Sequence, residues 1–293
     1  MTLTAGKIIV RRFIPMTLES LNHLAARLAG EDAVLVRVDA SQGSVPREAG
    51  AWMLVFARDF AGTVGGGHLE LMAIDEARRR MAGGSGEPVL RYPLGPSLGQ
   101  CCGGVMQLSF ERLGAADAAT VARRLAPRRI PVALFGGGHV GRALVGALGP
   151  LPFAVRWIDS RDEIFPDVLA ANLECEHSDP VQAAVADLVP GSHVLVMSFS
   201  HAEDLDVVAA CLKRQRVRGD LPFIGLIGSK TKWTTFRHRL EERGLSKQEL
   251  GQVTCPIGLA GIKGKQPEVI AVSVAAQLLQ LRAWETHETS PGT

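Results

Sequence analysis

The feature that most constrains the fold is a glycine-rich turn near the middle of the chain. An apolar run at 132–135 leads into this turn, and a helical pattern follows it through Leu148. The turn contains Gly136, Gly137, Gly138, His139 and Gly141. A strand, a Gly-x-Gly-x-x-Gly turn and a helix in this order are typical of dinucleotide-binding folds, because the glycines let a pyrophosphate approach the amides at the helix N-terminus. The sequence therefore predicts an anionic ligand here, and a turn used only for packing is the alternative.

The second half of the chain has the pattern of a doubly wound parallel sheet. Its apolar runs at 132–135, 153–158, 193–198 and 223–227 do not alternate with polar residues, as expected of strands covered on both faces. Helical stretches at about 180–188, 202–215 and 230–243 lie between or after them. A ligand of such a sheet binds beyond the carboxyl ends of the strands. The candidate binding residues at these ends are Asp159, Ser198, His201, Gly228 and Ser229.

Two of these residues allow a more specific interpretation. Asp159 stands about 20 residues after the glycine turn, where an acidic side chain accepts hydrogen bonds from a ribose hydroxyl. Arg161 nearby leaves a 2′-phosphate possible as well. Ser229 is expected to cap the helix that follows it, and simple capping next to the solvated charges of Lys230 and Lys232 is the plain alternative to ligand binding.

In the first half of the chain, expected helices and strands alternate less regularly. This pattern predicts an α+β domain. We expect a helix from Thr17 to about Ala29, strands at 33–38, 51–56 and 105–110, and a short edge strand at 88–92. The expected loops are 39–50 and 93–104, and a helix ends near Met81. The predicted organisation is an N-terminal α+β domain (1–112), a helical connector (113–130), a Rossmann-like domain (131–284) that ends in a buried helix from Pro267, and a disordered tail (285–293).

Composition excludes several classes of protein. Lys and Arg total 32 against 30 Asp and Glu, so no overall field attracts nucleic acid or an anionic membrane. The chain has neither an apolar stretch of the ~20 residues that a membrane span needs nor a signal-peptide pattern at its start, so we expect a cytoplasmic protein. The five cysteines show no C-x-x-C pair, which argues against a disulfide framework or a structural zinc site.

The first domain contains two further glycine-rich segments that carry chemistry. Gly65, Gly66 and Gly67 precede a helix that begins with His68 and Glu70, and these two side chains either face a ligand or only complete the helix start. The other segment reads Gln100, Cys101, Cys102, Gly103 and Gly104. Thiolate is a natural donor for a soft metal centre, although a loop cysteine is also often a small buried hydrophobe.

Residues for common catalysis are missing from the sequence. The only tyrosine, Tyr92, has no lysine four residues later, and neither a Gly-x-Ser-x-Gly motif nor paired histidines at metal-ligand spacing occur. The chain therefore resembles a binding protein more than an enzyme. An NAD(P)-dependent oxidoreductase with an unknown substrate is the alternative from another class, and a scaffold that never touches a cofactor is a third.

Taken together, the motifs resemble the XdhC/CoxI family, in order along nearly the whole chain. They are the segments 43–50, 62–70, 98–104, 135–141, 223–229 and 256–259. The resemblance implies an accessory protein of xanthine dehydrogenase, active in purine catabolism, that binds molybdenum cofactor (molybdopterin). Such a protein protects the cofactor during sulfuration by a cysteine-desulfurase-type donor and delivers it to the molybdenum subunit of apo-xanthine dehydrogenase. It also implies that Cys102 is a possible molybdenum-site thiol, with Cys101 as a neighbour, and that His68 stands where some relatives have cysteine.

From this resemblance we expect a non-catalytic chaperone in which three glycine-rich segments meet at a cleft between the domains. The segments are 65–67, 100–104 and 136–141. The Rossmann-like domain would hold the cofactor phosphate, a nucleotide such as NAD(P), or both. The apolar last helix makes a homodimer a reasonable expectation.

Overall fold

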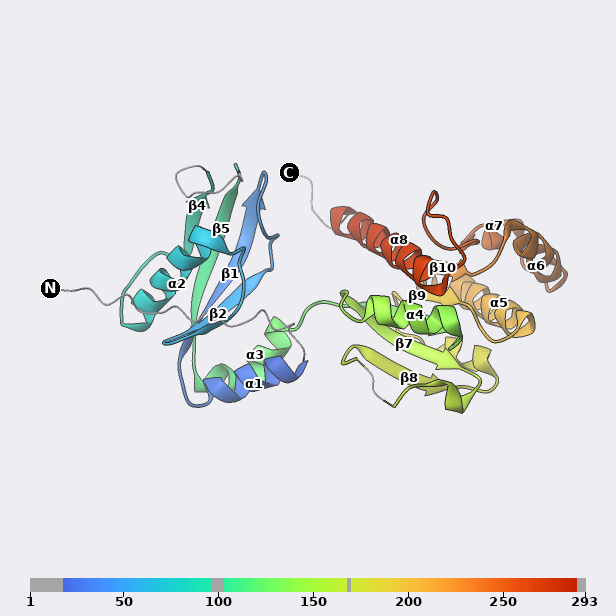
Figure 1. The fold of residues 1–293 in the computed structure, drawn as a ribbon, viewed down its shortest axis with the longest axis horizontal. Helices are drawn as coiled ribbons and strands as arrows, with labels where there is room; N and C mark the ends of the chain where they lie inside the picture. The colour runs from blue at the N-terminus through green and yellow to red at the C-terminus, as the bar shows by residue number, and fades with distance from the viewer. Residues whose placement is uncertain (1–17, 96–102, 168–169, 289–293) are drawn as a thin grey trace. The chain divides into compact units, whose positions relative to one another are not determined.

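The computed structural model describes residues 18–95, 103–167 and 170–288, and the chain divides into two compact units, Met1–Ala126 and Pro127–Thr293 (Figure 1). Each unit has its own sheet and its own hydrophobic clusters. The fold class predicted from the sequence, an α+β domain followed by a Rossmann-like domain, is confirmed.

The first unit is built on a five-stranded antiparallel sheet of order β3-β2-β1-β5-β4. The strands are β1 (Ala33–Gln42), β2 (Trp52–Phe56), β3 (Phe60–Gly62), β4 (Val89–Pro93) and β5 (Val105–Leu113). The helices are α1 (Leu18–Leu28), α2 (Gly67–Met81) and α3 (Ala118–Leu125), and a 3₁₀ turn, η2 (Ala115–Asp117), precedes α3.

Helices cover both faces of this sheet. Along β1, Val34 and Val36 pack in one cluster with residues of α2, whereas Ala33 and Leu35 pack in another with residues of α1 and α3. This division follows from the alternation of side chains along a strand. Of the segment expected as a connector (113–130), the part up to Ala126 therefore belongs to the first unit, because Val121 and Leu125 of α3 are buried in its core, whereas Ile130 already begins β6 of the second unit.

The strands of the first unit differ from the prediction at three places, one of which is the end of β5, at Leu113 instead of residue 110. The expected loop at 39–50 begins later than predicted, because β1 continues to Gln42 after a bulge between Val38 and Ala40. These added residues pair with the start of β5, and such tertiary pairing is invisible in a local polar pattern. β3 was not predicted, because three residues are too few to show a period.

The second unit contains a six-stranded sheet in which all neighbours are parallel, with the order β11-β10-β9-β6-β7-β8. The strands are β6 (Ile130–Phe135), β7 (Phe153–Asp159), β8 (Leu173–His177), β9 (His193–Val196), β10 (Phe223–Leu226) and β11 (Val253–Thr254). Numbered within the unit, this is the Rossmann order 3-2-1-4-5-6. The first three strands follow one another outward to one side of β6 and the last three to the other side, so the strand order reverses between β6 and β9.

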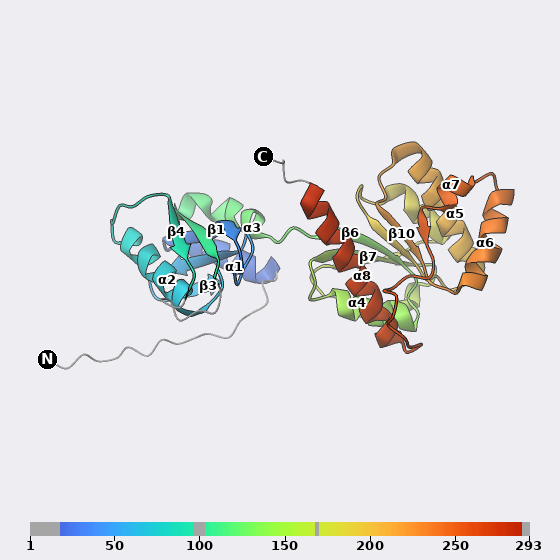
Figure 2. The same ribbon diagram turned by 90° about the horizontal axis from the view of Figure 1, so that it is seen from above.

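Helices pack on both faces of the parallel sheet, as Figure 2 shows. The helices are α4 (His139–Leu148), α5 (His201–Arg218), α6 (Lys230–Glu242), α7 (Lys247–Leu250) and α8 (Pro267–Glu288), with 3₁₀ turns η3 (Asp162–Ile164) and η4 (Val181–Asp187). α4 and α8 share one hydrophobic cluster with the sheet, and α5, α6 and η4 share the other. The strands are thus covered on both sides, as their apolar runs predicted.

Three expectations for the second unit need correction. The helix expected at about 180–188 is the 3₁₀ helix η4, and the polar edge strand β8 and the two-residue β11 were not predicted. Residues 285–288 of the expected disordered tail are helical, because α8 continues to Glu288, and 289–293 lie outside the described residues. Within the described ranges, no helix is long and apolar enough to span a membrane.

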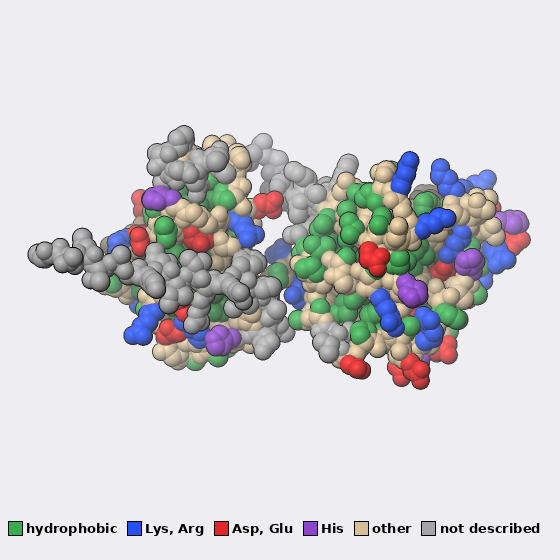
Figure 3. All heavy atoms as spheres, in the orientation of Figure 1, with side chains coloured by type: hydrophobic (Ala, Val, Ile, Leu, Met, Phe, Trp, Pro, Cys, Tyr) green, Lys and Arg blue, Asp and Glu red, His purple; other side chains and the backbone are tan. Residues whose placement is uncertain are grey.

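The outer face of α8 retains apolar side chains. Val272 is 60% exposed and Leu279 is 36% exposed within the second unit. Figure 3 shows hydrophobic side chains gathered over α4 and α8 on the face toward the viewer. The homodimer inferred from this helix stays a prediction.

Candidate functional site

Three loops of the first unit meet at one end of its antiparallel sheet. This is the end where β1, β3 and β4 finish and where β2 and β5 begin. A Cβ on Gly65 would lie 2.5 Å from Cγ of Pro46, so the loop after β3 packs directly on the loop after β1. A Cβ on Gly104 would lie 2.5 Å from the carbonyl oxygen of Gln42, which brings the start of β5 to the same place. The fold thus brings Gly65 and Gly104, from two glycine-rich segments of this unit, to the same end of the sheet.

Glu70 fastens the turn that leads into α2. Its Oε2 atom accepts hydrogen bonds from Thr63 Oγ1 (2.5 Å), from the Val64 amide (3.3 Å) and from the Gly66 amide (3.2 Å). Thr63 Oγ1 in turn accepts from the Gly65 amide at 3.1 Å. The carboxylate that the sequence offered as a ligand contact therefore holds its own loop in shape, and the amides of Gly65 and Gly66 are satisfied inside the chain.

The amides next in order are better placed for a ligand. Gly67 and His68 are the first two residues of α2, a helix of 15 residues, and both are exposed. First-turn amides have no acceptor within their helix, and the helix dipole adds partial positive charge. The positive φ angles of Gly65, Gly66 and Gly67 (138°, 76° and 64°) let the chain turn sharply into this helix. An anion that reached the turn would meet the amides of Gly67 and His68.

The candidate thiols lie outside the described residues. This applies to Gln100, Cys101 and Cys102, and therefore also to the metal ligation expected of Cys102. Residues 95 and 103, between which the thiols stand in the sequence, both lie at the loop end of the sheet, because the Leu94 amide donates to the Gly104 carbonyl at 2.8 Å. Gly103 is exposed, with open space where a side chain would stand, whereas Gly104 is buried.

An open hollow of about 420 Å³ lies beside these loops. It is lined by residues 45–49 and Ala51, and it includes the charged side chains of Arg47 and Glu48. The same Pro46 that packs on Gly65 forms part of its wall. The end of the sheet that carries the glycine segments is therefore also a concave surface.

The candidate residues of the second unit gather at the carboxyl edge of the parallel sheet. The glycine turn at 136–141 follows β6, Asp159 ends β7, Ser198 and His201 follow β9, and Gly228 and Ser229 follow β10. The strands run parallel, so their ends share one edge, as the sequence pattern predicted. Ser229 caps α6 as expected, because its side chain accepts from the Lys232 amide at 3.1 Å.

Asp159 is buried and fully engaged within the protein. Its carboxylate accepts hydrogen bonds from the amide of Gly137 (2.6 Å), and from the amide and guanidinium of Arg161. Burial acts to raise the pKa of Asp159, but the hydrogen bonds from Arg161 and Gly137 outweigh it and lower the pKa below its ordinary value. The group remains ionised, and it ties the glycine turn to the end of β7.

The sequence did not reveal a buried ion pair at the same edge. The sequence leaves Lys232 open between a solvated surface charge and a ligand contact, but its Nζ atom lies 2.6 Å from Asp204 Oδ2, and the two side chains are 13% and 3% exposed. Asp204 Oδ1 also accepts from the Ser198 amide at 2.7 Å. Lys232 passes Gly228 so closely that a Cβ there would lie 2.6 Å from its Cδ atom, which gives that glycine a packing role. No signal in the local pattern distinguishes this lysine from the exposed Lys230.

The remaining residues at the carboxyl edge of the parallel sheet differ in exposure and in hydrogen bonding. His139 and His201 are exposed, and the ring of His201 meets Phe236 edge-on at 6.2 Å. Glu203 accepts hydrogen bonds from Ser160 Oγ at 2.8 Å and from the Phe199 amide. The Ser198 hydroxyl is buried and has no hydrogen-bond partner among the described residues. A ligand at this edge of the sheet would therefore meet the exposed His139 and His201.

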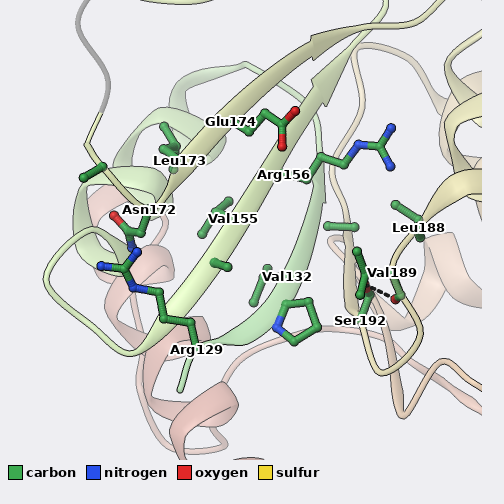
Figure 4. A pocket seen from close by; sticks show the side chains of 14 residues that line it. Arg129, Val132, Val155, Arg156, Asn172, Leu173, Glu174, Leu188, Val189 and Ser192 are labelled. Carbon is green, nitrogen blue, oxygen red and sulfur yellow. Dashed lines mark hydrogen bonds between the residues drawn. The ribbon is translucent and has the colours of Figure 1, made fainter. Parts of the chain in front are cut away.

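A hollow of about 290 Å³ in this unit lies at the opposite edge of the sheet (Figure 4). Arg129, Val155 and Leu173 line it near the amino ends of β6, β7 and β8. The neighbouring Asn172 amide group donates to the carbonyl oxygens of Phe153 and Leu148, so it is already used. This hollow contains none of the candidate binding residues.

Among residues 18–95, 103–167 and 170–288, no group of three or more His, Cys, Asp or Glu side chains could hold a metal. Three cysteines in these ranges are free thiols: Cys175, Cys211 and Cys255. Burial raises the pKa of each thiol, in Cys211 to about 12, so none is activated as a thiolate.

Comparison with known proteins gives two matching family descriptions. Residues 132–278 match the XdhC Rossmann domain, and residues 26–93 match the XdhC and CoxI family. A crystal structure described as a xanthine dehydrogenase from Bacillus halodurans has a TM-score of 0.72, covering 92% of this chain and 98% of that one. Its sequence identity is 19%, so the likeness is one of fold.

Two proteins of Escherichia coli K12 are similar in sequence. The molybdenum cofactor insertion chaperone PaoD is 26% identical over 288 residues, which cover 90% of this chain and 88% of PaoD. The uncharacterized protein YqeB is 25% identical over 269 residues, covering 88% of this chain, but the chain spans only 45% of that protein's length. The match to the XdhC Rossmann domain spans half of this chain, and the match to the XdhC and CoxI family precedes it. The chain therefore belongs to the XdhC and CoxI family.

Proposed function

We propose that this protein binds molybdenum cofactor as cargo, shields it while its terminal sulfur is installed, and delivers it to an apo-enzyme of the xanthine dehydrogenase type. The protein itself carries out no turnover chemistry. The observation that carries the proposal is the meeting of the glycine loops at one end of the first unit's sheet, where Gly65 packs on Pro46 and Gly104 on Gln42.

The chemistry of the cargo suits this arrangement. Molybdenum cofactor is a pterin with a phosphate and a dithiolene-bound metal, so a carrier needs amides for the anion and protection for the metal. Gly67 and His68 are exposed residues at the start of α2, and first-turn amides of a helix are donors of the kind that bind phosphate. The loop conformation is set before any ligand arrives, because Glu70 already holds it through its hydrogen bonds to Thr63 and Gly66.

The thiols are the second part of the proposal. Cys102 is the residue proposed to approach the metal, with Cys101 as its neighbour, since thiolate is a soft ligand. The flanking Gly103 leaves open space where a side chain would stand. The name of PaoD, a molybdenum cofactor insertion chaperone, supports the same role for this chain.

We assign the partners by the same reasoning. The recipient is the molybdenum subunit of the apo-dehydrogenase, and a cysteine-desulfurase-type enzyme supplies the sulfur. A carrier needs no catalytic residues. The described thiols agree with this role, because burial raises their pKa values and so disfavours the reactive thiolate. A second copy of the chain, docked through the exposed Val272 and Leu279 of α8, would make the homodimer.

Equilibrium dialysis against molybdopterin, followed by activation of apo-xanthine dehydrogenase, tests the proposal. A carrier retains the pterin and raises dehydrogenase activity when it is added already loaded. A protein that raises the activity without retaining the pterin is a scaffold, and that result would contradict the proposal. Cofactor-dependent reduction of NAD(P)⁺ with a small substrate would instead identify an oxidoreductase.

A further inference from the structure

The acceptor position for a nucleotide ribose in the second unit is already filled by the chain itself. In Rossmann folds, an acidic residue at the end of the second strand accepts from the ribose hydroxyls. Here that residue is Asp159, whose side chain is only 1% exposed. Its Oδ1 accepts from Arg161 N (2.9 Å) and Nε (2.8 Å), and its Oδ2 from Gly137 N (2.6 Å) and Arg161 Nη2 (2.9 Å). A carboxylate has about four acceptor positions, so none is left for a ribose.

The glycine turn is covered from the same side. A Cβ on Gly137 would lie 2.5 Å from Cγ1 of Ile164, so the isoleucine side chain packs directly on this glycine. The glycine whose backbone a pyrophosphate approaches in such a turn is the second of the motif, Gly138, which is exposed with open space where a side chain would stand, so the covered part of the crevice is its ribose side. Ile164 is held there because Arg142 Nη2 of α4 donates to its carbonyl oxygen at 2.9 Å.

The short segment between Asp159 and Ile164 is fixed at further points. Ser160 Oγ donates to Glu203 of α5 at 2.8 Å. The Arg161 guanidinium lies over the ring of Phe199, with its Cζ atom 4.4 Å from the ring centroid. Residues 160–164 are therefore tied to β7, α4 and α5 within the same unit.

We propose that residues 160–164 form a built-in plug over the ribose half of the Rossmann crevice, and that Arg161 is the residue that excludes NAD(P) from this unit. A ribose can reach Asp159 only if the guanidinium leaves a buried carboxylate, and separating such a pair is costly. The Rossmann unit then serves a ligand that needs no ribose acceptor. This inference concerns the second unit alone and stands or falls independently of the cargo proposed for the first.

Calorimetric titration of the full chain with NAD⁺ and NADP⁺ tests the plug. The variants are Arg161→Ala, whose side chain is 35% exposed in the wild type, and the double variant Arg161→Ala/Ile164→Ala. Arg216→Ala is the matched control, because Arg216 forms a comparable pair with Glu249 on other elements of the same unit. Circular dichroism verifies that each variant is folded.

We expect no heat of binding from the wild type or from Arg216→Ala. Arg161→Ala should bind NAD⁺ measurably, and the double variant should bind it about tenfold more tightly again, a difference that corresponds to about 1.4 kcal/mol. Adding Asp159→Asn to the double variant should weaken NAD⁺ binding, since Asp159 is the acceptor that the substitutions free. NADP⁺ should bind the double variant more weakly than NAD⁺, because the freed carboxylate repels a 2′-phosphate.

Two results would overturn the inference. One is micromolar binding of NAD⁺ or NADP⁺ by the wild type, which would show that the crevice is open. The other is a folded Arg161→Ala variant that binds no more dinucleotide than the wild type does, which would show that Arg161 is not the barrier. If Ile164→Ala unfolds the double variant, the single Arg161→Ala variant still decides between these outcomes.

Discussion

At the scale of single residues, the structure gives several charged side chains internal partners that the sequence does not reveal. Glu70 binds the amides of its own turn, and Asp159 binds Gly137 and Arg161. Lys232 is buried against Asp204, 28 residues earlier in the chain. The turns at the glycine-rich segments were predictable from the sequence, because glycine is the residue that such sharp turns require. The partners were not, because they are set by tertiary packing between distant segments.

The buried pair between Lys232 and Asp204 leads to a prediction about stability. Replacing Lys232 with Met leaves Asp204 as a buried charge without its cation, and we expect a loss of about 3–5 kcal/mol in the free energy of unfolding. Urea denaturation measures it. Lys230→Met, at an exposed position in the same helical turn, is the control, and equal effects of the two substitutions would contradict the assignment.

A carboxylate in the first unit leads to a prediction about pH. Hydrogen bonding to Arg79, assisted by Arg80, lowers the pKa of Glu76 from 4.5 to about 2. A pKa that is lower in the folded state stabilises the fold at pH values above 4.5, and this contribution is lost as the pH falls through about 2. The difference in unfolding free energy between the wild type and Glu76→Gln should therefore shrink over this range. A difference that is constant with pH would contradict the pairing.

At the scale of secondary structure elements, apolar pattern predicts the central elements well and the peripheral ones poorly. The strands β6, β7, β9 and β10 follow continuous apolar runs because they are buried on both faces. The edge strand β8 has the sequence Leu-Glu-Cys-Glu-His, and its charged residues conceal it. α3 was recognised as a helix but placed in a connector, since the sequence alone does not show what its apolar face contacts.

The position of α3 in the first core gives a prediction at this scale. Leu125 is 4% exposed and packs in the cluster that also contains Leu21 and Leu54. Replacing Leu125 with Ala should cost about 2–5 kcal/mol in the stability of this unit, because the substitution leaves a cavity. Arg123→Ala, on the exposed side of the same helix, serves as control in thermal and urea denaturation. If Leu125→Ala lost as little unfolding free energy as Arg123→Ala, α3 would be a linker and not part of the first core.

At the scale of the whole molecule, the order of motifs predicted the two fold types and the family, and both are confirmed. The approach of Gly65 to Pro46 and of Gly104 to Gln42 follows from the antiparallel topology, which places alternate loops at the same end of a sheet. The sequence identified these segments but did not show which amides they would leave for a ligand. Which amides remain for a ligand depends on Glu70, whose carboxylate already accepts hydrogen bonds from the amides of Val64 and Gly66.

The most direct test of the proposed cargo is molybdenum and pterin analysis of the full chain after purification without oxygen from cells that make the cofactor. The wild type and Cys175→Ala, which removes a free thiol from the second unit, should contain molybdenum and pterin in equal amounts. Cys102→Ala should contain clearly less metal. Wild-type protein free of both molybdenum and pterin, under conditions in which an apo-dehydrogenase in the same cells becomes loaded, would contradict the role of carrier.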